Sequence, residues 1–178
     1  MLLIRCQSEE DMAEPVLFDP HLDVNFRNEY GHFRMRVAAI IIEDGYLLTA
    51  TSERDPYHYF IGGAAHVCEH LEDAVKREAM EETGVSYEVD RLVMVTERIF
   101  PKKRMNGQME DFHEVCFYFL MKPRGKRDAE TQPVPPGCLI ENINWTRLED
   151  VKDIDLRPKY LADMITDLPK EIVHVVLS

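Results

Sequence analysis

The chain has 178 residues, 45% of them hydrophobic and 30% charged, which is typical of one globular domain with a sizeable core. Its net charge of −12 at pH 7 argues against non-specific nucleic-acid binding, because such binding needs a basic face. The longest apolar runs, 37–42 and 115–121, are too short to cross a bilayer. We therefore expect no membrane and no nucleic-acid partner, and any phosphate-bearing ligand must be received by local cations or by bound metal.

The amino-terminal residues lack the basic start, apolar segment and small-residue cleavage site of a signal peptide. The four cysteines are widely scattered and form no CxxC pair, which argues against a disulfide framework and against a zinc site. Together these features predict a cytoplasmic protein with reduced thiols.

Residues 1–31 are mixed and polar with two prolines, so we predict an appended segment there and one domain over residues 32–178. The domain opens with a β-branched run over 32–42, and a Glu-Asp-Gly turn separates it from a second run over 46–52. Two such runs predict a β-hairpin. Residues 57–63 follow as a short strand that ends in a glycine pair.

The region after this strand predicts a helix from Leu71 to Thr83, which Gly84 ends. The remaining elements are expected, in order, as strands over 87–100 and 111–122 joined by a basic loop, an irregular loop over 123–137, a strand over 143–148, a helix over 157–168 and a final segment over 171–178. Strands outnumber helices, and this predicts a mixed sheet with helices packed on it.

The last turn of the predicted helix carries three acids, Glu78, Glu81 and Glu82. This is unfavourable, because the carboxyl end of a helix already carries about half a negative charge. Glu78 and Glu82 also lie four residues apart, where like charges repel by about 0.2–0.5 kcal/mol. At about 100° per residue, both fall within the apolar stripe of the helix rather than on its polar side.

Two simpler explanations are a solvated acidic face and a buried pair between one glutamate and an arginine. The phase of the helix argues against the first, and converging carboxylates need more positive charge than one arginine supplies. Mg²⁺ supplies it, since it takes carboxylate ligands at about 2.1 Å and leaves positions open for water and substrate phosphate. We therefore predict a divalent metal beside the end of this helix.

The same residues belong to a longer motif: Gly63, five residues, Glu69, seven residues, and then Arg77-Glu78-Ala79-Met80-Glu81-Glu82-Thr83-Gly84-Val85. This pattern resembles the Nudix box of the Nudix hydrolase family at each of its defining positions. The resemblance covers about residues 33–178. It implies an α/β fold, the Nudix α/β/α sandwich with a central mixed β-sheet.

The resemblance also implies roles for individual residues. Glu78 and Glu82 are expected as the main Mg²⁺ ligands, with Mn²⁺ as a substitute. Glu81 is expected as a third ligand or as a residue that orders water, and the backbone carbonyl of Gly62 is expected to complete the metal shell.

Other positions of the box are expected to have structural roles. Arg77 and Glu69 resemble the family's ion pair between loop and helix, Gly63 is expected to permit the loop turn, and Gly84 ends the helix. The chain departs from the family at His66, where a glutamate is usual, and at Cys68, where a glycine is usual. Neither departure removes an expected metal ligand.

The implied reaction is hydrolysis of a pyrophosphate bond in a nucleoside diphosphate linked to another group, with metal activating a water and a carboxylate taking its proton. Glu78 and Glu81 are candidates for that carboxylate within the box. Glu114, an acid inside an apolar strand, and Glu141, just before a strand, are candidates outside it. The alternative for each of the last two is an ordinary solvated acid.

Substrate contacts are predicted from the basic cluster Lys102, Lys103 and Arg104, from Arg77, and from Tyr59, which together with its aromatic neighbours Tyr57 and Phe60 suits stacking on a base. A solvated hairpin tip and ordinary core packing are the alternatives for the basic cluster and for the aromatic residues.

The alternative function is a Nudix-fold sensor that binds a nucleotide without cleaving it, although such proteins commonly lose acids of the box. The leaving group stays open among ADP-ribose, other nucleotide sugars, dinucleoside polyphosphates and nucleoside triphosphates. Homodimerisation through the first 31 residues is a further open alternative.

Overall fold

The computed structural model describes residues 22–52, 56–104, 106–133 and 141–177. Its elements are, in order, β1 (Asn25–Arg27), β2 (His32–Ile40), β3 (Ile42–Glu43), β4 (Tyr46–Ser52), β5 (His58–Tyr59), α1 (Leu71–Thr83), β6 (Val89–Lys103), β7 (Met109–Met121), β8 (Glu141–Arg147), the 3₁₀ helix η1 (Leu148–Asp153), β9 (Leu156–Arg157), α2 (Lys159–Met164) and β10 (Val173–Leu177). No helix in these ranges is both long enough and apolar enough to cross a membrane.

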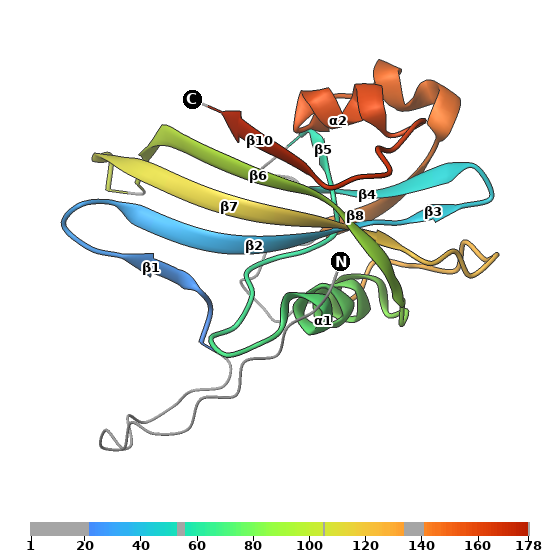
Figure 1. Cartoon of the computed structure of the whole chain (residues 1–178), viewed down its shortest axis with the longest axis horizontal. Helices are drawn as coiled ribbons and strands as arrows, with labels where there is room; N and C mark the ends of the chain where they lie inside the picture. The colour runs from blue at the N-terminus through green and yellow to red at the C-terminus, as the bar shows by residue number, and fades with distance from the viewer. Residues whose placement is uncertain (1–21, 53–55, 105, 134–140, 178) are drawn as a thin grey trace.

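The strands form two sheets. The first has the order β1-β2-β7-β6-β10, and the second has the order β3-β4-β5-β9 with β8 paired to the other edge of β4. Parallel and antiparallel pairs occur in both, for example parallel β2–β7 and antiparallel β6–β7. Helix α1 lies on one side of the strands, and α2 with η1 lies on the opposite side (Figure 1). The predicted α/β/α sandwich with mixed sheets is therefore confirmed.

Strand β2 shows how the sequence produces this layering. Its side chains alternate, so that Val37 and Ala39 join the core against α1, whereas Ala38 and Ile40 join the core against α2. The continuous apolar run in this part of the sequence is thus explained by a strand that is buried on both faces.

The predicted hairpin of 32–42 with 46–52 was wrong in its extent. Only β3 pairs with β4, as Ile42↔Leu47 and Glu43↔Tyr46, while β2 runs parallel to β7 in the other sheet. The connecting turn has two residues, Asp44 and Gly45, and both have positive φ, as the tight turn of a β-hairpin requires. The chain therefore changes sheets between Ile40 and Ile42.

Helix α1 has the predicted bounds, and its buried residues include Val75 and Ala79. Gly84 ends it in the left-handed conformation, with φ of 70°. The second helix is shorter than predicted: α2 covers only Lys159–Met164, with Pro158 at its N-cap position.

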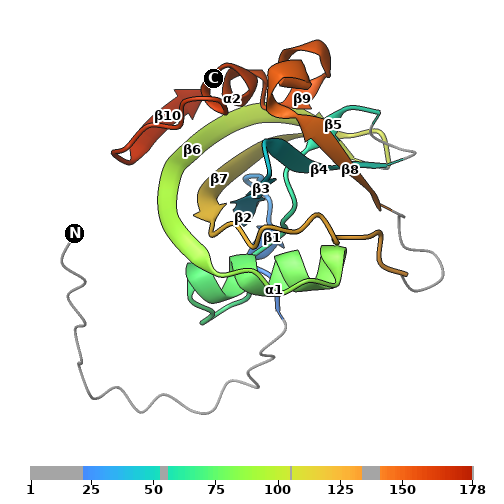
Figure 2. The same ribbon diagram turned by 90° about the vertical axis from the view of Figure 1, so that its right-hand side faces the viewer.

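The basic loop is also shorter than predicted, because β6 extends to Lys103 and β7 begins at Met109. Strand β6 curves strongly across the molecule (Figure 2).

Within the predicted appended segment, residues 25–27 pair with β2 as an edge strand, and residues 1–21 lie outside the described part of the chain. A boundary at residue 31 stays a prediction.

Candidate active site

The centre of the site is the loop before α1 together with the acids of that helix. A Cβ atom placed on Gly63 would lie 2.7 Å from both carboxylate oxygens of Glu78. Gly63 is therefore needed for space, because its missing side chain leaves room for the Glu78 carboxylate. The sequence had predicted a role in turning the loop instead.

One residue earlier, Gly62 has a backbone conformation that favours glycine. Gly62 has φ of +138°, and a Cβ there would lie 2.2 Å from the carbonyl oxygen of Val37. Only glycine fits this conformation and this approach. The N–H of Gly62 donates to Glu82 Oε1 at 3.1 Å, so the loop backbone holds one of the two inward-facing acids.

Arg77 connects the loop to the helix. Its Nε donates to Glu69 Oε1 at 2.8 Å, and one Nη donates to Glu69 Oε2 at 3.0 Å and to the carbonyl of Ala64 at 3.1 Å. The Arg77 hydrogen bonds hold the pKa of Glu69 below its usual value. The expected ion pair is therefore present, and Arg77 contacts protein groups rather than lining the cavity described below.

The second Nη of Arg77 donates to Glu78 at 2.8 Å and to Glu81 at 3.2 Å. Burial raises the pKa of Glu78, although Arg77 opposes the rise and Glu81 adds to it. The side chain of Glu78 is 13% exposed, whereas that of Glu81 is 57% exposed. Of these two acids, Glu78 therefore points inward as predicted, and Glu81 lies at the surface.

Cys68 occupies a left-handed backbone position with φ of 62°. This conformation explains why glycine is usual here in the family, because a side chain costs about 1–2 kcal/mol in it. His66, at the other departure, donates its backbone N–H to Glu69 at 2.9 Å. Both departures thus leave the loop geometry in place.

The residues present fit a divalent cation. The donor set is oxygen only, from two carboxylates and a backbone carbonyl, which is what Mg²⁺ prefers, and the space beside Gly63 holds a carboxylate whose burial disfavours its charge. Among the described residues, no three His, Cys, Asp or Glu side chains are grouped closely enough to hold a metal by themselves. The carbonyl of Gly62 accepts a hydrogen bond from Arg36 at 2.7 Å, which leaves it a second lone pair.

A cavity of about 860 Å³ opens beside Gly62, Gly63 and Glu82. Its described lining includes only two carboxylates, Glu82 and Glu114. The lining cations are Arg34, Arg36, Arg98, Lys102, Arg157 and Lys159. The lining aromatic residues are Tyr57, Tyr59, Phe60, Phe100, Phe112, Tyr118 and Tyr160. A protein of net charge −12 thus has a cavity that is strongly cationic.

Glu114 lines this cavity and is 3% exposed. Arg34 Nε donates to it at 2.8 Å and Arg98 Nη2 at 2.7 Å. Burial alone would raise its pKa, but Arg34, Arg98 and Arg36 together hold that pKa below the usual value. These bonds make Glu114 a weak proton acceptor and favour a positioning role. The side chain of Glu141 lies outside the described residues, and its backbone begins β8 opposite Ser52.

The three basic residues of the predicted cluster separate in the structure. Lys102 lines the cavity and lies over the ring of Phe112 at 4.4 Å. Arg104 instead donates to Glu110 at 2.7 Å, and neither Arg104 nor Lys103 lines the cavity. Tyr59 lines it as expected.

Four cavity arginines were missed by sequence reasoning: Arg34, Arg36, Arg98 and Arg157. The first two lie two residues apart in β2, so they share a face opposite the apolar side chains between and after them. Arg98 and Lys102 lie four residues apart in β6, so they also share a face. Charged residues at an even spacing within a strand were the signal that could have found these strand residues.

Residues 32–168 match the family model described as the NUDIX domain. The chain is 30% identical over 116 residues to the NAD-capped RNA hydrolase NudC of Escherichia coli (strain K12 / DH10B), which covers 65% of this chain and 39% of that protein. The chain thus spans well under half the length of this relative.

Two solved structures show the same fold. The MutT protein from Bacillus halodurans superposes with a TM-score of 0.58 at 15% identity, covering 79% of this chain and 86% of that one. The ADP-ribose pyrophosphatase from Streptococcus suis 89-1591 superposes with a TM-score of 0.53 at 15% identity, covering 81% and 98%. At these identities the likeness concerns the fold alone.

Proposed function

Since this chain belongs to the Nudix family by its match over residues 32–168, we propose that it is a Mg²⁺-dependent hydrolase of a pyrophosphate bond in a nucleoside diphosphate linked to another group. The observation that supports this most is the position of the cationic, aromatic cavity directly beside Gly62, Gly63 and Glu82. Cations suit a diphosphate, aromatic rings suit a base, and the oxygen donors at the edge suit a metal.

Arg36 supports the phosphate assignment. Its Nη2 donates to the carbonyls of Phe60 at 3.1 Å and Gly62 at 2.7 Å, which fixes the guanidinium at the metal end of the cavity. Its Nε is buried and has no hydrogen-bond partner among the described residues. A buried donor without an acceptor is costly, and a phosphate oxygen of the substrate would remove that cost.

Glu78, Glu82 and the Gly62 carbonyl would hold the metal, with Glu81 at its exposed side. A Mg²⁺ ion held there would supply an acidified water and would neutralise phosphate oxygens. The chain itself binds the diphosphate through Arg36, and a carboxylate takes a proton from the attacking water. The candidates for this general base are Glu78 and Glu81 within the box and Glu141 outside it, whereas the ion pairs of Glu114 with Arg34 and Arg98 make it a weak proton acceptor.

The test is a hydrolysis assay with Mg²⁺ on a panel that contains ADP-ribose, other nucleotide sugars, nucleoside triphosphates, NAD and NAD-capped RNA. Substituting Glu82→Gln removes one metal-binding charge, so we expect kcat to fall by at least about 100-fold without a change in the circular dichroism spectrum. Glu72→Gln is the matched control, because Glu72 lies exposed in the first turn of the same helix.

An unimpaired Glu82→Gln variant would refute the metal assignment. A wild type that binds these nucleotides by calorimetry but cleaves none of them would support the sensor, which is the alternative. A cytoplasmic location and a homodimer stay predictions from the sequence, and NAD-capped RNA in the panel tests the expectation that no nucleic acid is a substrate.

A further inference from the structure

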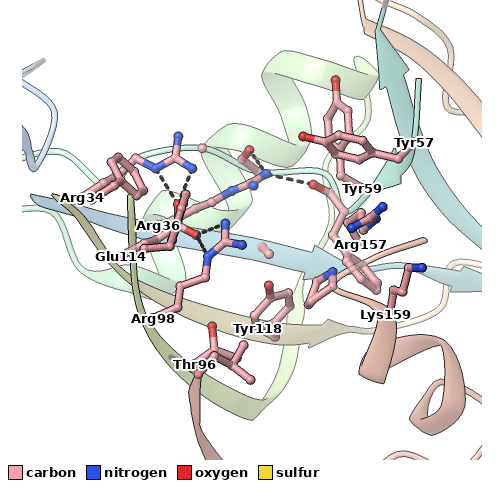
Figure 3. A pocket seen from close by; sticks show the side chains of 18 of the residues that line it. Arg34, Arg36, Tyr57, Tyr59, Thr96, Arg98, Glu114, Tyr118, Arg157 and Lys159 are labelled. Atoms are coloured by element: carbon pink, nitrogen blue, oxygen red, sulfur yellow. Dashed lines mark hydrogen bonds and ion pairs between the residues drawn. The ribbon is translucent and has the colours of Figure 1, made fainter. Parts of the chain in front are cut away.

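The cavity has two chemically different ends. Tyr57 and Tyr59 lie together with Arg157 at one end, whereas Arg34, Arg98 and Glu114 lie together at the other, with Arg36 between the two groups (Figure 3). The first end combines aromatic rings with a cation, which suits a nucleobase. The second end holds two arginines and a carboxylate, a combination that an uncharged nucleobase does not require. This end therefore suits a different chemical group of the ligand.

Glu114 organises the second end. It accepts hydrogen bonds from Arg34 of β2 on one side and from Arg98 of β6 on the other, so both of its carboxylate oxygens have hydrogen-bond partners. Each arginine gives Glu114 its Nε and one Nη nitrogen. The remaining Nη of each guanidinium is left for a second acceptor, so the pair forms a preorganised fork for an anion.

Aromatic rings support the same cations. Arg98 lies 4.9 Å from the ring centroid of Phe100, and Arg34 lies 5.5 Å from that of Phe112. Lys102 packs on the same Phe112 ring at 4.4 Å. Such contacts favour a cation over a ring by about 0.5–2 kcal/mol and limit the rotamers it adopts. The cations therefore stay directed toward the cavity before any ligand binds.

The charge at this end exceeds what a diphosphate needs. Arg36, Gly62 and Glu82 already line the part of the cavity that is expected to take the pyrophosphate. Arg34, Arg98 and Lys102 are additional, and Glu114 is the one carboxylate among the described lining residues at this end. A net charge near +2 in a partly buried wall is best matched by a group of charge near −2, which a phosphomonoester carries at neutral pH.

We propose that the substrate is a nucleoside diphosphate whose second moiety carries a further phosphomonoester, held by Arg34, Arg98 and Lys102. This rests on the proposed function. It names the substrate class of the same cavity, and it assigns Glu114 as a positioning residue that acts through the two arginines.

The experiment compares ADP-ribose with ADP-ribose phosphorylated on its terminal ribose. We expect kcat/KM to be at least about tenfold higher for the phosphorylated compound, and its Kd from calorimetry in EDTA to be lower by a similar factor. A second pair, UDP-glucuronate and UDP-glucose, tests whether a carboxylate in place of the phosphomonoester is sufficient for the preference. Preference only in this second pair would overturn the phosphomonoester assignment.

The matched variants are Arg98→Met and Arg27→Met. Arg98→Met keeps an unbranched side chain but removes the guanidinium that forms one arm of the fork, so the preference for the phosphorylated compound should collapse toward unity in both assays. Arg27 makes the same kind of pair with Glu110 outside the cavity, and its substitution should leave the preference intact.

The outcomes separate the two proposals. Equal kcat/KM and equal Kd for ADP-ribose and its phosphorylated form would overturn the anion subsite and leave the hydrolase standing. Failure to cleave or bind either compound and every other member of the panel would instead count against the proposed function. A preference that survives Arg98→Met unchanged would also contradict the assignment.

Discussion

At the scale of single residues, the adjacent positions 62 and 63 are both occupied by glycine, but for different physical reasons. A side chain on Gly62 would meet the backbone of Val37, which cannot move without disturbing β2, whereas the atoms nearest to a side chain on Gly63 belong to the flexible end of Glu78. The first glycine therefore protects the fold, and the second protects the position of an acid that we assign to the metal.

This difference predicts that adding one methyl group lowers stability at position 62 and activity at position 63. Gly62→Ala should lower the free energy of unfolding by about 2–3 kcal/mol, measured by urea denaturation. Gly63→Ala should leave that free energy nearly unchanged but reduce kcat about 100-fold, because the Glu78 carboxylate is displaced. If the two variants lost the same amount of stability and the same amount of activity, the assignment would be contradicted.

At the scale of elements, Arg77 joins the loop before α1 to the helix itself. It reaches Glu69 and Ala64 in the loop and Glu78 in the helix. The low pKa of Glu69 reflects this pairing. A carboxylate whose folded pKa is depressed contributes stability above its unfolded pKa, and this contribution is lost as the pH falls through its folded pKa.

Arg77→Gln should therefore destabilise the protein by about 2 kcal/mol near pH 7. The difference from wild type should shrink as the pH falls below 4.5, the ordinary pKa of the glutamate. The measurement is urea unfolding in EDTA at pH 7, 5 and 3.5. Lys76→Gln, which removes a surface pair with Asp73, should show little effect at any of these values; a difference that did not depend on pH would count against the ion pair.

At the scale of the whole molecule, charge is distributed unevenly. The protein carries −12 overall, yet the described residues that line its cavity include six cations and only two carboxylates. An anionic substrate is therefore repelled by most of the surface and attracted by the site. Steering of this kind depends on ionic strength, because the Debye length is about 10 Å at 0.1 M salt.

We expect KM for an anionic substrate to rise several-fold between about 0.05 and 0.5 M NaCl at saturating Mg²⁺, with kcat changing less than about twofold. Binding of adenosine, which carries no phosphate, should be nearly independent of salt in the same range. A KM that stays constant would show that the cavity arginines do not attract the substrate by charge.

Local patterns in the sequence were enough for α1, its bounds, its buried face and the inward direction of Glu78. Each of these follows from helical periodicity, a terminating glycine and the spacing of the box, all within about twenty residues of chain. The Arg77–Glu69 pair was likewise accessible, because a loop and the helix that follows it are close in space.

The tertiary structure decided everything that depends on strands distant in the chain. Residue 34 in β2 meets residue 114 in β7, and residue 98 in β6 meets the same glutamate from the other side, so the anion fork exists only after the first sheet has formed. Likewise the run 32–42 divides between two sheets because β7 pairs with β2 more extensively than a local hairpin can. Pairing between strands that are far apart in the sequence is a property of the folded sheet, and the residues next to each strand in the sequence predict it only weakly.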